Sequence, residues 1–222
     1  MRLKDKVAIV TGSASGMGAA TAQLFAAEGA KVVLTDILEE EGSTLAAEIS
    51  GDAQFQKLDV TSEGDWEKLV GVTLSAFGRV DILINNAGVS GSHPDLLNTT
   101  TWDEQMNVNA RGVFLGMRSV IPKMQQASGG SIVNISSISG IVGSPNAPVY
   151  SAAKGAVRLF TKSTALECAS LEYNIRANSI HPGVIDTLMG AQVVNTIIEQ
   201  TGSGDNEARA QVSELHPLGR FG

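Results

Sequence analysis

Short apolar segments alternate with longer amphipathic segments along this 222-residue chain. The short segments are rich in Val, Ile and Leu at successive positions, which is typical of strands buried between two layers of helices. Most of the longer segments carry apolar residues every three or four positions and predict helices. We expect strands at residues 6–10, 31–35, 53–60, 80–86, 130–136 and 174–181, and helices at residues 17–29, 66–78, 101–125 and 149–171.

This alternation predicts an α/β fold with one doubly wound parallel sheet and helices on both faces, in a single domain over residues 1–222. Gly29 and Gly78 stand where a glycine commonly ends a helix. Residues 186–214 interrupt the alternation of strands and helices with two short amphipathic segments around the sequence TGSGD. We expect them to form a substrate loop or lid, and an ordinary pair of surface helices is the alternative.

Composition narrows the class of protein. The net charge of −7 comes without a basic stripe, so we expect no nucleic-acid partner. No stretch of about 18 apolar residues and no signal-peptide core is present in the sequence, so we expect no membrane partner. The single cysteine, Cys168, is expected to be a small buried side chain in a reducing compartment. We therefore expect a cytoplasmic protein with no metal site.

A glycine-rich turn follows the first predicted strand and opens the first predicted helix. Its residues Gly12, Gly16 and Gly18 allow the backbone to turn sharply and to approach a pyrophosphate, while the helix N-terminus favours an anion. The spacing G-x-x-x-G-x-G differs from the G-x-G-x-x-G fingerprint, and a purely structural tight turn is the alternative. With the predicted sheet, this turn indicates a Rossmann-like dinucleotide-binding fold.

Polar residues at the ends of later strands support a site at the same edge of the sheet. Asp36 ends the second strand, LDV at residues 58–60 ends the third, and NNAG at residues 85–88 ends the fourth. In doubly wound sheets the ligand crevice lies beyond these carboxyl ends. A carboxylate at Asp36 can accept from ribose hydroxyls and repels the extra phosphate of NADP, so we expect NAD as the cofactor. The alternative is that Asp36 only caps the next helix.

Three residues after and around the fifth strand form a candidate catalytic group. Tyr150 and Lys154 are four residues apart and share one helix face, and Ser137 follows the strand at the same edge. An ammonium group and the positive charge of an oxidised nicotinamide both favour a phenolate, and Ser137 can hold a substrate oxygen. The trio suits proton transfer at a carbinol oxygen, whereas a lone tyrosine and lysine would indicate ordinary packing.

Together, TGSASGMG, NNAG, the spacing of Ser137, Tyr150 and Lys154, and HPG at residues 181–183 resemble the short-chain dehydrogenase/reductase family. The resemblance covers essentially the whole chain. Residues 136–169 and 181–187 are most similar to bacterial NAD-dependent secondary-alcohol dehydrogenases and carbonyl reductases. The resemblance implies an NAD(H)-dependent oxidoreductase that interconverts a small-molecule secondary alcohol and its ketone. It also implies a homotetramer in which two long helices form a major interface.

The resemblance assigns further site residues. Asn109, in NVNARGVF, would support a proton relay through water to Lys154, with Asn107 as the less favoured neighbour. Residues 59 and 60 would border the adenine, and the segment after residue 182 would contact the nicotinamide. The implied cofactor-binding residues are Gly12, Ser15, Gly16, Met17, Gly18, Asp36, Ile37, Asp59, Val60, Asn86, Ala87, Gly88, Tyr150, Lys154, Pro182, Gly183, Ile185 and Thr187.

Other interpretations of the sequence remain open. A hydroxysteroid dehydrogenase or 3-oxoacyl reductase would share this fold and catalytic group, and a catalytically silent dinucleotide-binding scaffold is the alternative outside enzymes. His181 precedes a proline at a strand end, and we expect it to have a structural role rather than to act as an acid or base. His93 and His216 have no evident acidic or thiol partners in the sequence. Family members continue after HPLGRFG with a helix, a seventh strand and a DGG-like ending, so we expect the native chain to be longer.

Overall fold

A computed structural model describes residues 1–90, 95–144 and 147–222. Within these residues, six parallel strands form one sheet in the order β3-β2-β1-β4-β5-β6. The strands are β1 (Val7–Thr11), β2 (Lys31–Asp36), β3 (Ala53–Lys57), β4 (Ile82–Asn85), β5 (Gly130–Ile135) and β6 (Ile175–Ile180). Because the strand order reverses between β1 and β4, a crevice is expected at the carboxyl ends of these strands. The predicted Rossmann-like sheet is confirmed.

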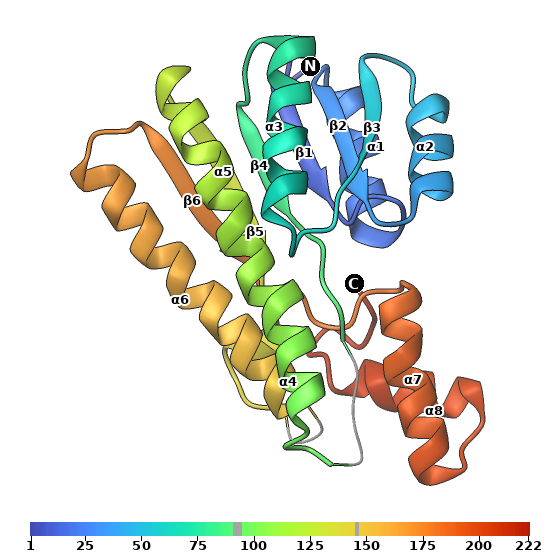
Figure 1. The fold of residues 1–222 in the computed structure, drawn as a ribbon. Helices are drawn as coiled ribbons and strands as arrows, with labels where there is room; N and C mark the ends of the chain where they lie inside the picture. The colour runs from blue at the N-terminus through green and yellow to red at the C-terminus, as the bar shows by residue number, and fades with distance from the viewer. Residues whose placement is uncertain (91–94, 145–146) are drawn as a thin grey trace.

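Helices cover both faces of the sheet (Figure 1). The helices α1 (Gly16–Ala27) and α2 (Glu39–Glu48) pack on one face, and α3 (Glu63–Phe77), α5 (Gly112–Gln126) and α6 (Pro148–Ser170) pack on the other. Before α5 come α4 (Thr99–Gln105) and the π-helix η1 (Met106–Arg111), and after β5 comes the short 3-10 helix η2 (Ile138–Gly140). Beyond the carboxyl ends of the strands lie α7 (Leu188–Thr201) and α8 (Asp205–Glu214).

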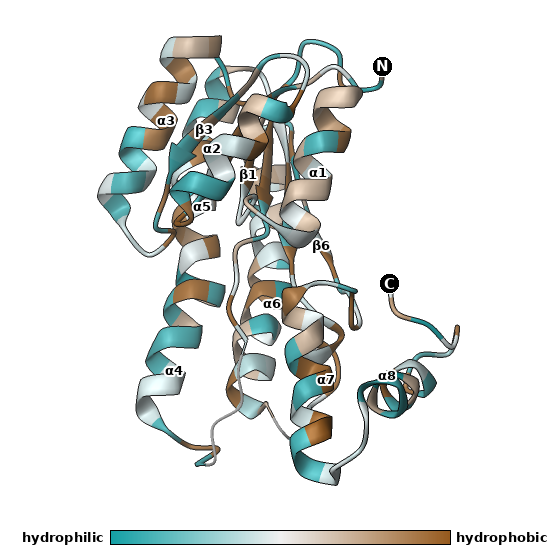
Figure 2. Cartoon of the chain, turned by 90° about the vertical axis from the view of Figure 1, so that its right-hand side faces the viewer, coloured by the Kyte–Doolittle hydropathy of each residue, from teal (hydrophilic) through white to brown (hydrophobic). Residues whose placement is uncertain are grey.

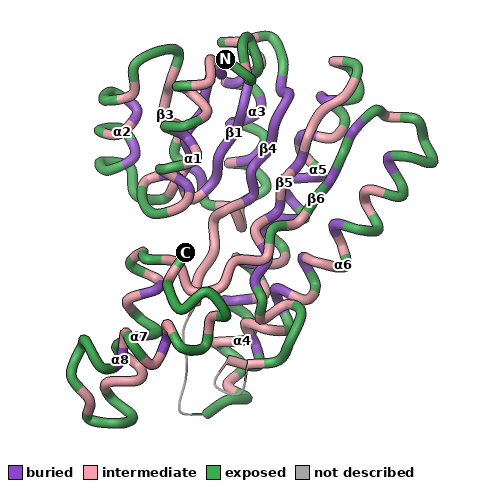
Figure 3. Tube along the Cα trace, turned by 180° about the vertical axis from the view of Figure 1, so that it is seen from behind, coloured by how far each residue is buried: buried purple, intermediate pink, exposed green. Residues whose placement is uncertain are grey.

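Alternate residues of the central strands face two separate cores, as the two-residue period of a strand requires. In β1, Ala8 and Val10 pack in the core under α1 and α2, whereas Ile9 packs in the core that contains Trp66 of α3. Figure 2 shows hydrophobic residues along β1, and Figure 3 shows that β1 and β4 are almost wholly buried. Cys168 is 2% exposed and belongs to the larger core, as its sequence context predicts.

Several elements differ from the sequence prediction, among them α3, which begins at Glu63 rather than at residue 66. The charged segment of α2 was not predicted as a helix; it packs because Gly42 leaves room for Phe55, whose ring would lie 2.1 Å from an added Cβ. The third strand ends at Lys57, three residues early, because Asp59 turns the chain toward α3. The long helix predicted at residues 101–125 is divided into α4, η1 and α5.

The segment at residues 186–214 folds into a helical unit with its own small core. Thr187 caps α7 through its hydroxyl, which accepts from the Gly190 amide, and Gly202 ends α7 with φ +72°. Buried Val194 of α7 packs with Ala208 of α8. Within the described residues, no helix is both long and apolar enough to cross a membrane.

Candidate active site

The glycine turn after β1 is packed so closely that side chains cannot be accommodated. A Cβ added at Gly12, where φ is +62°, would lie 2.7 Å from the Cα of Ala87, and one at Gly18 would lie 2.1 Å from the oxygen of Gly12. Gly16 has φ +54° and faces Thr187, whose Cγ2 would lie 3.3 Å from an added Cβ. The result is a turn lined by backbone at the N-terminus of α1, which suits an anionic phosphate group.

The NNAG segment after β4 is tied directly to this turn. The side-chain Nδ2 of Asn86 donates to the oxygens of Thr11 and Gly12, at 3.0 and 2.9 Å. The hydroxyl of Thr11 accepts from the backbone amides of Asn86 and Ala87, both at 3.0 Å. Thr11 begins the TGSASGMG motif, but no role was predicted for it, because its partners at residues 86 and 87 are distant in the sequence.

Asp36 is held against the same turn at the end of β2. One carboxylate oxygen accepts from the Ala14 amide at 3.0 Å, and the other accepts from the Leu38 amide at 3.1 Å. The neighbouring Ile37 is 62% exposed. The negative charge of Asp36 therefore lies beside the glycine turn. The same carboxylate also fixes the chain before α2 through its hydrogen bond with the Leu38 amide.

The predicted catalytic trio comes together where β5 meets α6. Ser137 precedes η2, Tyr150 lies in the first turn of α6, and the Nζ of Lys154 lies 5.7 Å from the centroid of the Tyr150 ring. Lys154 is 3% exposed, and its Nζ donates to the oxygen of Ile135 at 2.9 Å. The hydroxyl of Ser136 donates to the main-chain oxygen of Lys154 at 2.8 Å, which fixes the helix against the strand.

Burial dominates the ionisation of this group. It raises the pKa of Tyr150, and a hydrogen bond with Ser137 offsets part of that rise. Burial also lowers the pKa of Lys154 from its ordinary value of 10.5 to about 8. The sequence predicts a lowered tyrosine pKa beside an ammonium group. Removal of the phenol from water raises that pKa, and the lowering expected beside an oxidised nicotinamide stays a prediction.

Asn109 lies in the π-helix η1, fully buried, and clamps the loop that follows NNAG. Its Oδ1 accepts from the Val89 amide at 3.0 Å and its Nδ2 donates to the Val89 oxygen at 2.9 Å. A Cβ added at Gly88 would lie 2.8 Å from Oδ1 of Asn109 and 3.4 Å from Nζ of Lys154. The structure thus brings the side chains of Asn109 and Lys154 close to the same position at Gly88.

The segment after β6 borders both halves of the cleft. The main-chain oxygen of Pro182 accepts from the Ile138 amide at 3.0 Å, next to Ser137, and Thr187 lies against Gly16. His181 contacts the main-chain oxygen of Ser137 through Nδ1 at 3.2 Å and the Ser179 hydroxyl through Nε2 at 2.9 Å. Its contacts therefore join β6 to the start of η2.

Several predicted cofactor residues lie at the turns that begin α1 and α3. The carboxylate of Asp59 accepts from Thr61, and the oxygen of Val60 accepts from the indole of Trp66, so both belong to the turn before α3. Ser15 is exposed at the N-cap of α1, and Met17 follows it in the first turn. His93 lies outside the described residues.

A buried polar chain links the strands to the catalytic helix and was also missed. Asn85 donates to the side-chain oxygen of Asn134 at 2.8 Å, and Asn134 donates to the hydroxyl of Thr161 at 2.9 Å. All three side chains are at most 3% exposed. Since these residues come from β4, β5 and α6, their contact could be found only in three dimensions.

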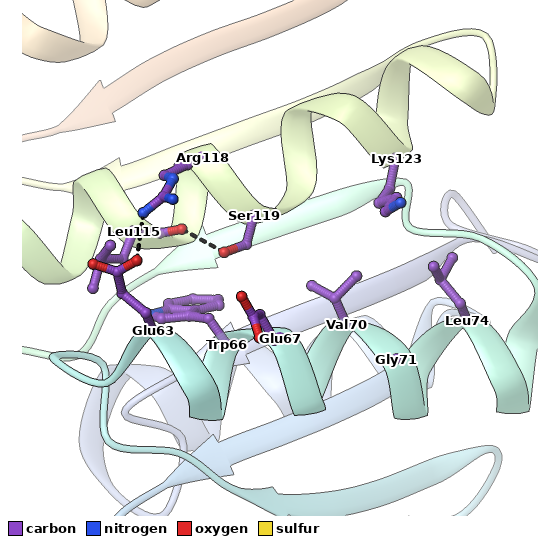
Figure 4. Close-up of a pocket in the computed structure, with 10 residues that line it drawn as sticks. All are labelled: Glu63, Trp66, Glu67, Val70, Gly71, Leu74, Leu115, Arg118, Ser119 and Lys123. Atoms are coloured by element: carbon purple, nitrogen blue, oxygen red, sulfur yellow. Dashed lines mark hydrogen bonds and ion pairs between the residues drawn. The ribbon is translucent and has the colours of Figure 1, made fainter.

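A separate groove of about 410 Å³ lies between α3 and α5 (Figure 4). Trp66, Val70 and Leu115 line it, and an ion pair of 2.6 Å between Arg118 and Glu63 crosses one end. No member of the catalytic trio lines this groove. The trio and the glycine turn lie instead at the carboxyl ends of the strands, and we take the cleft there as the candidate active site.

Comparison with known proteins agrees with this geometry. Residues 6–197 match the family model described as "short chain dehydrogenase". A cyclopentanol dehydrogenase of Comamonas sp. is 49% identical over 87% of this chain and 78% of that relative. A 3-alpha-(or 20-beta)-hydroxysteroid dehydrogenase of Mycobacterium bovis is 46% identical over 96% of this chain and 82% of the relative.

A third relative is named for its cofactor as well as its activity. The NADP-dependent (R)-specific alcohol dehydrogenase of Lentilactobacillus kefiri is 46% identical over 84% of this chain and 75% of its own length. The family match and these relatives confirm the expected class of oxidoreductase, which acts on CH–OH groups. The chain belongs to the short-chain dehydrogenase family.

Proposed function

We propose that this protein is an NAD(H)-dependent oxidoreductase that interconverts a secondary alcohol and its ketone, with Tyr150 as the acid and base. The observation that carries the proposal is the placement of Tyr150 beside Ser137 and Lys154 at the carboxyl ends of the strands, next to the glycine turn. Proton transfer and cofactor binding can therefore take place in one cleft.

The residues at the turn fit a dinucleotide. The turn at Gly12, Gly16 and Gly18 leaves backbone where any Cβ would clash or be strained, so a pyrophosphate can approach the N-terminus of α1. Asp36 is placed to accept from the ribose of the adenosine, and the ammonium group of Lys154 would donate to the other ribose. The nicotinamide supplies or accepts the hydride when bound.

The side chains of the trio perform the proton chemistry in this proposal. During ketone reduction, the hydroxyl of Tyr150 donates its proton to the carbonyl oxygen, and Ser137 holds that oxygen through a hydrogen bond. During alcohol oxidation, the Tyr150 phenolate removes the proton. With a pKa of about 8, Lys154 is mostly protonated at neutral pH and stabilises the phenolate. Asn109 fixes the loop at Val89 and supports the proton relay to Lys154.

The preference for NAD over NADP rests on charge at the end of β2. Asp36 would repel a phosphate on the adenosine ribose, and residues 13–15 and Ile37 offer no cation to compensate. The relative from Lentilactobacillus kefiri is named as NADP-dependent, so the cofactor has to be tested directly. Equal kcat/KM values for NADH and NADPH would contradict the role of Asp36.

The substrate in this proposal is a cyclic or otherwise compact secondary alcohol. The relative from Comamonas is named for cyclopentanol, and the one from Mycobacterium bovis for hydroxysteroids, which keeps a steroid as the second candidate. The helical unit of α7 and α8 follows directly after the segment at residues 182–187. It would form the substrate lid and set the size limit of the site.

We also propose a cytoplasmic homotetramer. Phe114 and Phe160, with ring centroids 5.9 Å apart, line an apolar groove between α5 and α6, and Phe114 is 44% exposed. A second copy of the chain could cover this face.

Turnover with a panel of ketones tests the proposed activity. NADH oxidation should be measured with cyclopentanone, cyclohexanone, a steroid ketone and a 3-oxoacyl thioester. The proposal expects the highest kcat/KM with a cyclic ketone. A higher value with the steroid or thioester would favour those alternatives, and no turnover with any ketone despite NADH binding would favour a silent scaffold.

A further inference from the structure

His216 lies after α8, far along the chain from the catalytic trio, yet it contacts the segment that enters the active site. Its Nε2 accepts from the backbone amide of Val184 at 3.0 Å, and its Nδ1 contacts the main-chain oxygen of Val212 at 2.8 Å. A Cβ added at Gly183 would lie 2.6 Å from Nε2. The imidazole therefore lies directly against the main chain of residues 183 and 184.

These contacts determine the protonation state of the ring. A main-chain oxygen can only accept, so Nδ1 must carry a proton and donate it to Val212. A backbone amide can only donate, so Nε2 must present its lone pair to Val184. The observed arrangement therefore requires a neutral imidazole with its proton on Nδ1.

Val184 is held on both sides, and its neighbours face the cleft. The Gly222 amide donates to the Val184 oxygen at 3.0 Å. Two residues before Val184, the oxygen of Pro182 accepts from the Ile138 amide, beside Ser137. Three residues after it, Thr187 lies against Gly16 of the glycine turn. A shift at Val184 would therefore move a segment that spans the cleft from the catalytic trio to the cofactor turn.

We propose that His216 is a positioning residue that holds residues 182–187 in the conformation that binds cofactor, and that it does so only when neutral. The proposal rests on the proposed function and on the nicotinamide contact that the family resemblance implies for the segment after residue 182. Protonation would place an N–H group at Nε2 opposite the N–H of Val184, and the hydrogen bond would be lost. Cofactor affinity should therefore fall as the pH drops through the range in which imidazoles take up a proton.

The groups around the ring are aromatic and charged, and none of the charged groups that the structure describes pairs with His216. Phe221 stacks on it with ring centroids 6.4 Å apart, and His216 forms no ion pair within the described part of the chain. The Arg209 guanidinium lies 5.5 Å from the Phe221 centroid. The charged groups on the elements packed around the ring are Asp186 of the segment, Asp205, Glu207, Arg209 and Glu214 of α8, and Arg220 of the terminal segment. Asp186 and Asp205 are paired with Arg209, at 3.3 and 3.4 Å.

Two substitutions separate the hydrogen bond from the packing of the ring. His216→Gln keeps an oxygen that can accept from Val184 but does not titrate, and His216→Phe keeps a ring but removes the acceptor. The dissociation constant of NADH should be measured by fluorescence for the parent protein and both variants, from about pH 8 to about pH 5.8, across the range of imidazole titration.

At about pH 8, we expect the parent and His216→Gln to bind NADH similarly, and His216→Phe to bind about tenfold more weakly, the usual scale of one lost hydrogen bond. At about pH 5.8 the parent should lose several-fold in affinity relative to His216→Gln, because glutamine cannot take up a proton at this position. A constant ratio between these two at every pH would overturn the proposal. Unchanged binding by His216→Phe at the higher pH would also overturn it.

Hydrogen exchange tests His216 without cofactor, so its outcome is separate from the proposed function. The amides of residues 183–187 should be measured in the parent and His216→Gln at both pH values, with correction for the intrinsic exchange rate. We expect protection to fall on acidification in the parent alone. Equal protection in both proteins would refute the role of His216, whereas a failure of NADH to bind to any of the proteins at any pH would refute the proposed function instead.

Discussion

Replacing Lys154 with methionine should stabilise the folded protein at neutral pH while removing its activity. Lys154 is 3% exposed, and its burial lowers its pKa from 10.5 to about 8. A difference of this size between the folded and unfolded chain corresponds to about 3 kcal/mol, since each pKa unit is worth about 1.4 kcal/mol. Methionine has a similar length and no charge, so it removes that cost.

The direction of the pH dependence follows from the lowered pKa. Between about pH 8 and pH 10.5 the unfolded chain keeps the proton that the folded chain has released, so the stability of the parent protein rises with pH in this window. The variant also loses the hydrogen bond from Lys154 to Ile135, which lowers its stability by about 1 kcal/mol at every pH and offsets part of the gain. The variant should therefore be about 2 kcal/mol more stable near pH 7, and this advantage should disappear by about pH 10.

Urea unfolding at fixed protein concentration, near pH 7 and near pH 10, measures this difference. Lys162→Met is the matched control, because Lys162 is an exposed lysine on the same helix, α6. Its stability difference from the parent should be small at both pH values. If Lys154→Met is less stable than the parent near pH 7, or if its difference from the parent does not change with pH, the reasoning about a buried ammonium is wrong.

Three further results are expected. Gly18→Ala should weaken NADH binding at least tenfold, because the alanine Cβ would lie 2.1 Å from the oxygen of Gly12 and such a clash costs about 1–3 kcal/mol. An affinity equal to that of the parent, measured by calorimetry, would contradict this. Asp36→Ala combined with Ile37→Arg should shift the NADH-to-NADPH ratio of kcat/KM toward NADPH by about tenfold or more, and an unchanged ratio would place the discrimination elsewhere. Phe114→Glu should reduce the assembly size measured by light scattering, and an unchanged mass would remove the groove between α5 and α6 from the interface.

The parallel sheet could be predicted from sequence because its signals are local. Each central strand is a short apolar run, and the glycines that end helices stand in place, as Gly78 does with φ +78° at the end of α3. The positions of Ser137, Tyr150 and Lys154 could also be predicted, because strand ends and helix periodicity place them. Their pKa values could not, because burial depends on the whole fold.

The features that were missed depend on contacts between distant segments. The π-helix η1 holds Asn109 against Val89, which is 20 residues away in the sequence. No local sequence pattern predicts the change from α-helix to π-helix at this point. The helix α2 depends on the fit of Gly42 to Phe55 from β3. His216 contacts Val184 across 32 residues of chain. The local sequence therefore predicts which helix or strand a residue belongs to, whereas its contacts with distant residues are known only from the fold.

The most direct test of the proposed mechanism compares the parent protein with Tyr150→Phe. This substitution removes the proton donor and leaves the ring in place, so NADH should still bind. Reduction of the best ketone should slow by at least about a hundredfold in kcat, the usual scale of general acid–base catalysis. Turnover close to that of the parent, with NADH binding intact, would contradict the assignment of Tyr150 as the acid and base.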